Sequence, residues 1–175
     1  MAGTLDIEDH ASLIEHLRRT RRIEPDAHPR ARTLRGGVSN RTVLVEFDDG
    51  RPWVLKQALA RLRVQVDWFS RPERIGREAL GLQRLAELAP PGAITPLVFE
   101  EPEEHVLAME AVPQPHENWK AMLLSGRVDG AHVEAFGALL GTIHVLVSVV
   151  GRDEAVALVV AEPLHGSRGH RGTSG

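Results

Sequence analysis

Cysteine is absent from this chain of 175 residues. The chain therefore has no disulfide bonds and no thiolate metal ligands, a composition typical of proteins from a reducing compartment. No apolar run is long and uncharged enough to span a membrane, and Asp6-Ile7-Glu8-Asp9 is acidic where a secretory signal would be basic. We therefore expect a cytoplasmic protein with no membrane segment.

The chain also lacks the excess of positive charge that nucleic-acid binders carry. Its formal net charge is −3 at pH 7, which argues against a nucleic-acid partner. The local exception, Arg18-Arg19-Thr20-Arg21-Arg22, closes an expected helix that starts near Asp9 and has Leu13, Ile14 and Leu17 on its apolar face. Because the macrodipole favours cations at a helix carboxyl end, a solvated helix end is the default interpretation, and nucleic-acid contact is the alternative.

Lysine is scarce, since only Lys56 and Lys120 stand among the 21 basic residues. Lys56 ends a short apolar run from Pro52 that predicts a strand. Upstream lie a small-residue loop, Gly36-Gly37-Val38-Ser39-Asn40, an alternating strand-like stretch from Thr42 to Phe47, and a turn signal at Asp48-Asp49-Gly50. Taken alone, Lys56 would be an exposed strand-end residue. The order of loop, strand, turn and strand with lysine instead favours a kinase-type lobe, which lays a loop over ATP phosphates and brings an ammonium to them.

A lysine of this kind needs a carboxylate partner on the next helix, because a desolvated ammonium must be held by an opposite charge. A helix is predicted from about Pro72 to Leu88. Within it, Glu78 shares one face with Ile75, Leu82 and Leu85 at helical spacing. Glu78 is therefore either half of a buried pair with Lys56 or a boundary residue that extends its carboxylate to solvent.

Several of these segments together resemble the aminoglycoside phosphotransferase family, a kinase-like group that includes choline kinase and methylthioribose kinase. The similarity covers about residues 30 to 144 and depends on order and spacing. The segments that carry it are Gly36 to Asn40, Val54-Leu55-Lys56-Gln57, Leu62-Arg63-Val64 through Asp67-Trp68-Phe69, Arg77-Glu78-Ala79 and Met109-Glu110-Ala111-Val112.

The resemblance implies an ATP site. Gly36, Gly37, Ser39 and Asn40 would belong to the loop that covers the phosphates, Lys56 would contact the α- and β-phosphates, and Glu78 would orient Lys56. Met109 to Val112 would link two lobes, with backbone groups near Glu110 and Val112 facing the adenine. The alternative for this last segment is a core strand, His105 to Met109, that ends in an ordinary loop at Pro113 and Pro115.

The groups that would complete catalysis are missing from the sequence. A kinase-like site needs an aspartate for the acceptor hydroxyl, and an asparagine and a second aspartate for magnesium. The only asparagines are Asn40 and Asn118, and His165-Gly166-Ser167 has serine where the family's catalytic loop has aspartate. We therefore assign no catalytic and no metal-binding residue.

The expected fold class is α+β: a protein-kinase-like amino-terminal lobe with an antiparallel sheet of about five strands and one helix, followed by the first helix of a truncated second lobe. Residues 1–110 would form the lobe and residues 111–144 the linker and a helix from Ala131 to His144. Residues 145–175 are an atypical stretch that ends in a glycine-rich tail, which we expect to be disordered. The lobe should expose an apolar face and be prone to self-association.

Three functions compete. The leading hypothesis is an ATP-dependent phosphotransferase that acts on a small-molecule hydroxyl, truncated here and inactive alone. The second is a non-catalytic nucleotide-binding or interaction module. The third is a truncated or frameshifted product without independent function.

Overall fold

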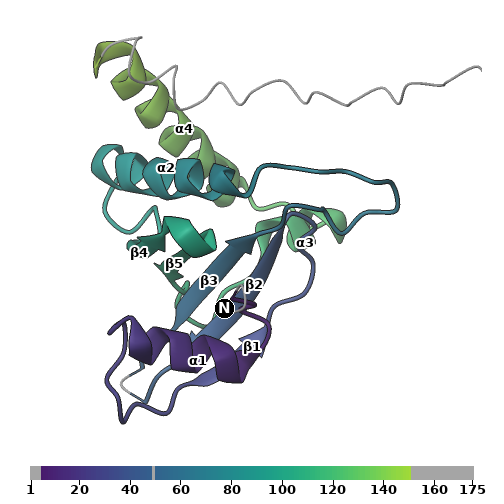
Figure 1. Cartoon of the computed structure of the whole chain (residues 1–175). Helices are drawn as coiled ribbons and strands as arrows, with labels where there is room; N and C mark the ends of the chain where they lie inside the picture. Colours follow the sequence, from purple (N-terminus) through teal and green to yellow (C-terminus); the bar gives the residue numbers. More distant parts are fainter. Residues whose placement is uncertain (1–4, 49, 151–175) are drawn as a thin grey trace, which may run out of the picture.

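A computed structural model describes residues 5–48 and 50–150. The chain has an α+β fold with one five-stranded antiparallel sheet, in the strand order β1-β2-β3-β5-β4, and the predicted fold class is confirmed (Figure 1). The strands are β1 (Arg30–Thr33), β2 (Asn40–Glu46), β3 (Trp53–Ala58), β4 (Leu97–Glu101) and β5 (Val106–Glu110). The helices are α1 (His10–Arg19), α2 (Ile75–Leu88), α3 (Trp119–Leu124) and α4 (Gly130–Val150), with short 3-10 turns at Pro72–Arg74 and Pro102–Glu104.

The predicted hairpin joins β2 to β3. The two strands pair antiparallel from Asn40 opposite Ala58 to Val45 opposite Trp53. In the turn, the Gly50 N–H donates to the Phe47 carbonyl at 3.1 Å, and Gly50 has a φ of 79°, which favours glycine. Asp49, the middle residue of the predicted turn signal, lies outside the described residues.

Alternation along β3 assigns its side chains to two different cores, because successive side chains of a strand point to opposite faces. Leu55 packs in the core that α1 covers, whereas Ala58 packs in the core that α2 covers. Figure 1 shows these two helices on opposite faces of the sheet. The buried residues of the α1 core are Ile7, Leu13, Leu17, Val43, Val45, Leu55, Phe99, Val106 and Ala108. Those of the α2 core are Ala58, Ile75, Ala79, Leu107 and Met109.

Helix α1 begins and buries its apolar face as the sequence predicts. The Asp9 carboxylate accepts from the Ser12 N–H at 3.3 Å, which caps the first turn. Leu13 and Leu17 are buried. The sequence analysis did not assign His16, which is also buried and lies with Nε2 2.8 Å from Glu101 Oε2 on β4. A polar residue on an apolar helix face was the available signal for this contact.

Helix α4 is longer than predicted. It continues to Val150, six residues beyond the expected end at His144. The β-branched run after His144 weakens a helix only slightly, and the first glycine or proline after His144 in the sequence is Gly151. The glycine-rich tail predicted to be disordered lies outside the described residues.

Apolar side chains of α3, α4 and their connection are exposed. They are Leu123, Leu124, Val128, Val133, Phe136, Leu140 and Val145. Self-association through this face remains a prediction. Among the described residues, no helix combines the length and the apolar character needed to cross a bilayer.

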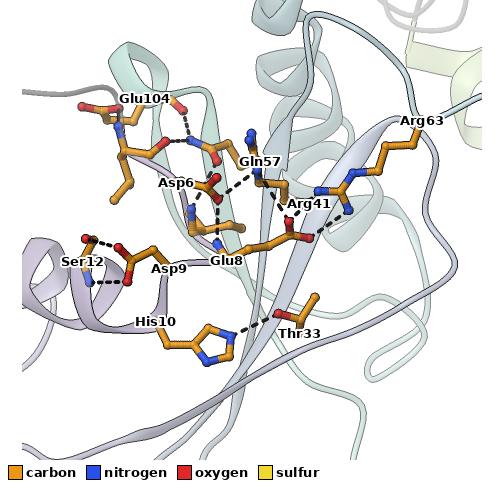
Figure 2. A network of polar contacts seen from close by, with 12 residues as sticks. Asp6, Glu8, Asp9, His10, Ser12, Thr33, Arg41, Gln57, Arg63 and Glu104 are labelled. Carbon is orange, nitrogen blue, oxygen red and sulfur yellow. Dashed lines mark hydrogen bonds and ion pairs between the residues drawn. The ribbon is translucent and has the colours of Figure 1, made fainter.

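The amino-terminal segment is attached to the sheet by one buried amide. Gln57 on β3 donates from Nε2 to the carbonyls of Leu5 at 2.7 Å and Glu104 at 3.2 Å, and its Oε1 accepts from the Ile7 N–H at 3.4 Å (Figure 2). Leu5 also donates from its N–H to Glu104 Oε2 at 3.1 Å. A single side chain therefore joins three separate parts of the sequence.

We expect Gln57→Ala to lower the free energy of unfolding by about 1–3 kcal/mol, because it leaves buried backbone groups without partners. Denaturant unfolding measures this change. Gln83→Ala is the matched control, since Gln83 is an exposed glutamine on α2. Equal effects of the two substitutions would contradict the role given to Gln57.

Candidate functional site

Lys56 and Glu78 form an ion pair between the sheet and α2. The Lys56 ammonium donates to Glu78 Oε1 at 2.5 Å, and the two side chains are 29% and 36% exposed. Lys56 stands opposite Thr42 on β2 and Leu107 on β5, so it lies inside the sheet and not at an edge. The predicted pairing is confirmed. A pair this exposed contributes only about 0.2–1 kcal/mol to stability, so stability alone does not account for a lysine at this position.

The glycine-rich loop joins β1 to β2 and needs its glycines. Gly36 has a φ of 112°, a conformation that side chains disfavour. A Cβ on Gly37 would lie 3.3 Å from the Asn40 carbonyl oxygen, which leaves little room for a larger residue. The backbone of the loop is therefore specified by two adjacent glycines.

The loop is held by its carbonyl groups. The Val38 carbonyl accepts from the Arg63 N–H at 2.8 Å, and the Ser39 carbonyl accepts from the Leu59 N–H at 3.0 Å. In the part of the chain that the structure describes, no group accepts a hydrogen bond from the N–H of Gly37 or Val38, and both residues are exposed. A loop with anchored carbonyls and unpaired amides can bind an anion.

Arg74 is a second support of the loop that the sequence analysis missed. It ends the 3-10 turn before α2 and donates from Nη2 to the Ser39 carbonyl and to Asn40 Oδ1, the latter at 3.0 Å. Burial lowers the pKa of the Arg74 guanidinium below its ordinary value, and Glu78 acts in the opposite direction. The available signal was an arginine four residues before Glu78, which a helix places on the same face.

The segment after β5 leaves defined backbone groups at the surface. The Glu110 N–H donates to the Pro96 carbonyl at 2.9 Å, and the Ala111 N–H donates to the Pro52 carbonyl at 2.9 Å. Pro96 has no N–H with which to bond the Glu110 carbonyl in return. For the N–H of Val112, whose side chain is exposed, the described residues provide no acceptor. Among the described residues, the Glu110 carbonyl and the Val112 N–H therefore remain without a hydrogen-bond partner where the chain leaves β5.

The structure brings some predicted residues together and leaves others apart. Lys56 and Glu78 contact each other, and the loop from Gly36 to Asn40 reaches the same helix through Arg74. Glu110 lies opposite Trp53, at the other end of β3 from Ala58. Within residues 5–48 and 50–150, no three histidine or acidic side chains gather as a metal site.

Two cavities lie away from this site. One of about 420 Å³ is bordered by Arg21, Phe47 and Trp53, near the β2–β3 turn. The other, of about 600 Å³, is bordered by Trp119, Met122 and His132 on α3 and α4. Neither is bordered by Lys56 or Glu78, so chemistry and not cavity size identifies the candidate site.

Arg63 connects the loop to the amino-terminal segment. Its N–H donates to the loop, as described above, and its guanidinium donates to both carboxylate oxygens of Glu8 (Figure 2). The hydrogen bond from Arg63 is the main reason why the pKa of Glu8 lies below its ordinary value. The amino-terminal segment, which Gln57 attaches to the sheet, thus contacts Arg63, which in turn supports the glycine-rich loop.

Comparisons with known proteins identify no family. No protein-family profile matches the chain. No curated protein sequence matches it either. Among solved structures, the chain is similar to the streptomycin–ATP–APH(2″)-IIa ternary complex, with 16% identity and a TM-score of 0.42. The match covers 75% of this chain and 35% of that one. At this level the similarity assigns no function to the chain.

We expect the Glu8–Arg63 contact to be sensitive to acid. Because the pKa of Glu8 is lowered in the folded chain, the contact stabilises the fold above the pKa of an unfolded glutamate and is lost as pH falls through the lowered value. Arg63→Gln should raise the Glu8 midpoint in an NMR pH titration. The midpoint of Glu117, whose pKa is lowered by Arg127, serves as the control and should not change. A Glu8 midpoint that stays in place would contradict the contact.

Proposed function

We propose that the chain is the ATP-binding amino-terminal lobe of a kinase-like phosphotransferase that acts on a small-molecule hydroxyl. The observation that carries this proposal is the Lys56–Glu78 pair, together with a loop whose carbonyls are anchored and whose Gly37 and Val38 amides bond to no described residue. The similar solved structure is a ternary complex with ATP and streptomycin, which agrees with the proposal without adding weight to it.

Each residue has a proposed role at the nucleotide. The N–H groups of Gly37 and Val38 would donate to phosphate oxygens, with Gly36, Ser39 and Asn40 shaping the loop. Lys56 would place its ammonium at the α- and β-phosphates, and Glu78 would keep it there. At the other end of β3, the Glu110 carbonyl and the Val112 N–H would provide the acceptor and donor that an adenine edge needs.

Phosphoryl transfer requires more than these residues. An acceptor base and carboxylate ligands for magnesium are needed to position the hydroxyl and offset the developing charge, and the described residues have no cluster of this kind. We propose that residues 1–110 bind the nucleotide and that residues 111 onward begin a second, helical lobe. The 175-residue chain should therefore bind ATP weakly and transfer no phosphoryl group.

A non-catalytic interaction module is the second candidate. The exposed apolar side chains of α3 and α4 favour it, because a contiguous apolar face on a folded protein commonly marks a contact surface. In that case the face would bind another macromolecule or a second copy of the chain, and nucleotide would be dispensable.

Calorimetry with ATP tests the first proposal. We expect weak binding to the wild-type chain, and Lys56→Ala should raise the dissociation constant about tenfold because a charge-assisted contact to phosphate is lost. Lys120→Ala is the matched control, since Lys120 is the other lysine and is exposed on α3. Tight ATP binding that Lys56→Ala leaves unchanged would contradict the proposed ATP site. Robust phosphorylation of any acceptor would contradict the expectation that this chain transfers no phosphoryl group.

Sedimentation velocity tests the apolar face. We expect concentration-dependent self-association that Leu140→Gln weakens, because Leu140 is 50% exposed on α4 and the substitution removes apolar area from the contact. Leu80→Gln is the control, since Leu80 is 41% exposed but lies on α2. A chain that stays monomeric at all concentrations, or two variants with equal effects, would contradict an interface on α4.

A further inference from the structure

Arg74 makes a set of contacts unusual for a half-buried arginine. Its Nη2 donates to the Ser39 carbonyl and to Asn40 Oδ1, and its Nη1 donates to the carbonyls of Leu59 at 3.4 Å and Arg71 at 3.3 Å. All of these acceptors are neutral. In the described part of the chain, Arg74 has no carboxylate within ion-pair distance.

The four acceptors match the four terminal hydrogens of the guanidinium in number, because each Nη carries two. These contacts direct the terminal N–H groups of Arg74 to the loop and to the chain beside it, so we expect any role at the nucleotide to act through the loop. The partners also have a clear pattern. Ser39 and Asn40 belong to the glycine-rich loop, Leu59 follows β3, and Arg71 precedes the turn that leads into α2.

Helix α2 and the 3-10 turn that leads into it thereby hold both halves of the proposed site. Arg74 and Glu78 are four residues apart and share a helix face, with Arg74 contacting the loop and Glu78 contacting Lys56. A shift or rotation of α2 that moved one contact would move the other. The loop and the Lys56 ammonium are thus both attached to this continuous stretch of chain, from Arg74 to Glu78.

We propose that Arg74 is a positioning residue of the nucleotide site, which fixes the glycine-rich loop relative to the Lys56–Glu78 pair through α2. This proposal rests on the proposed function for its relation to ATP, but the contact between Arg74 and the loop does not depend on a ligand. A purely electrostatic role for the guanidinium is the competing explanation.

Arg74→Lys separates the two explanations. Lysine keeps the positive charge but donates from a single nitrogen. It therefore cannot reach all four acceptors that the two Nη atoms of Arg74 contact. The exposed Arg77, on the same helix, provides the matched control Arg77→Lys. Arg74→Met, which removes the charge as well, completes the set.

Amide hydrogen exchange on the nucleotide-free chain measures the positioning directly. The informative amides are those of Leu59 and Arg63, because they donate to the loop carbonyls of Ser39 and Val38. We expect Arg74→Lys to speed exchange of these two amides about tenfold, the loss expected for hydrogen bonds from a charged donor. The exchange rate of the Leu55 amide, in the centre of β3, should be unchanged, which would exclude global unfolding as the cause. Unchanged exchange at Leu59 and Arg63 would overturn the proposal.

Asn40→Leu gives a second variant that leaves Arg74 intact. It removes one acceptor at similar side-chain volume, so the Leu59 and Arg63 amides should exchange about threefold faster, less than with Arg74→Lys. This variant decides the question if Arg74→Lys does not fold. An Asn40→Leu chain with wild-type exchange at both amides would also count against the proposal.

Affinity for ATP and for adenosine supplies the final comparison. If Arg74 positions the loop, Lys and Met at position 74 should both weaken ATP binding about tenfold and leave adenosine binding unchanged, because only the phosphates meet the loop. If Arg74→Lys keeps wild-type ATP affinity while Arg74→Met loses it, the electrostatic explanation holds and the proposal fails. If the wild-type chain binds no ATP, the proposed function fails, and the exchange measurement still decides whether Arg74 holds the loop.

Discussion

The ion pair between Lys56 and Glu78 is the contact on which the candidate site depends. Alternation along β3 directs Lys56 to the face that α2 covers, where an ammonium without a partner would be partly desolvated among apolar side chains. Glu78 meets it from the first turn of α2, so the pair joins the helix to the sheet. With side chains 29% and 36% exposed, such a pair contributes only about 0.2–1 kcal/mol to stability.

The glycine-rich loop adds backbone N–H donors to this ammonium. Backbone donors from Leu59 and Arg63 hold its carbonyls, while the N–H groups of the exposed residues Gly37 and Val38 have no acceptor in the part of the chain that the structure describes. The Arg63 guanidinium continues to Glu8, and the segment around Glu8 is held in turn by Gln57. The loop therefore has supports on both sides of the sheet, even though few of them are close to it in sequence.

The exit of β5 leaves a backbone carbonyl without a ladder partner because of one proline. Pro96 accepts the Glu110 N–H but has no N–H of its own to return, so the Glu110 carbonyl is left for another donor. Beyond this point the chain turns to α3 and α4, whose exposed apolar side chains contrast with the well-buried cores on both faces of the sheet.

Local patterns in the sequence were sufficient for the sheet, the hairpin, helix α2 and the pairing of Lys56 with Glu78, because strand alternation and helical spacing determine which side chains share a face. Tertiary structure decided the rest. Three sets of contacts join residues that are distant in the sequence. They are the contact of His16 with Glu101, the three hydrogen bonds of Gln57, and the hydrogen bonds of Arg74 to the loop. The spacing of apolar residues along the sequence cannot predict such pairs, because they depend on which helices and strands pack together in the fold. The end of α4 differs from the predicted end at His144 for a local reason, because composition changes there but no residue that must stop a helix occurs before Gly151.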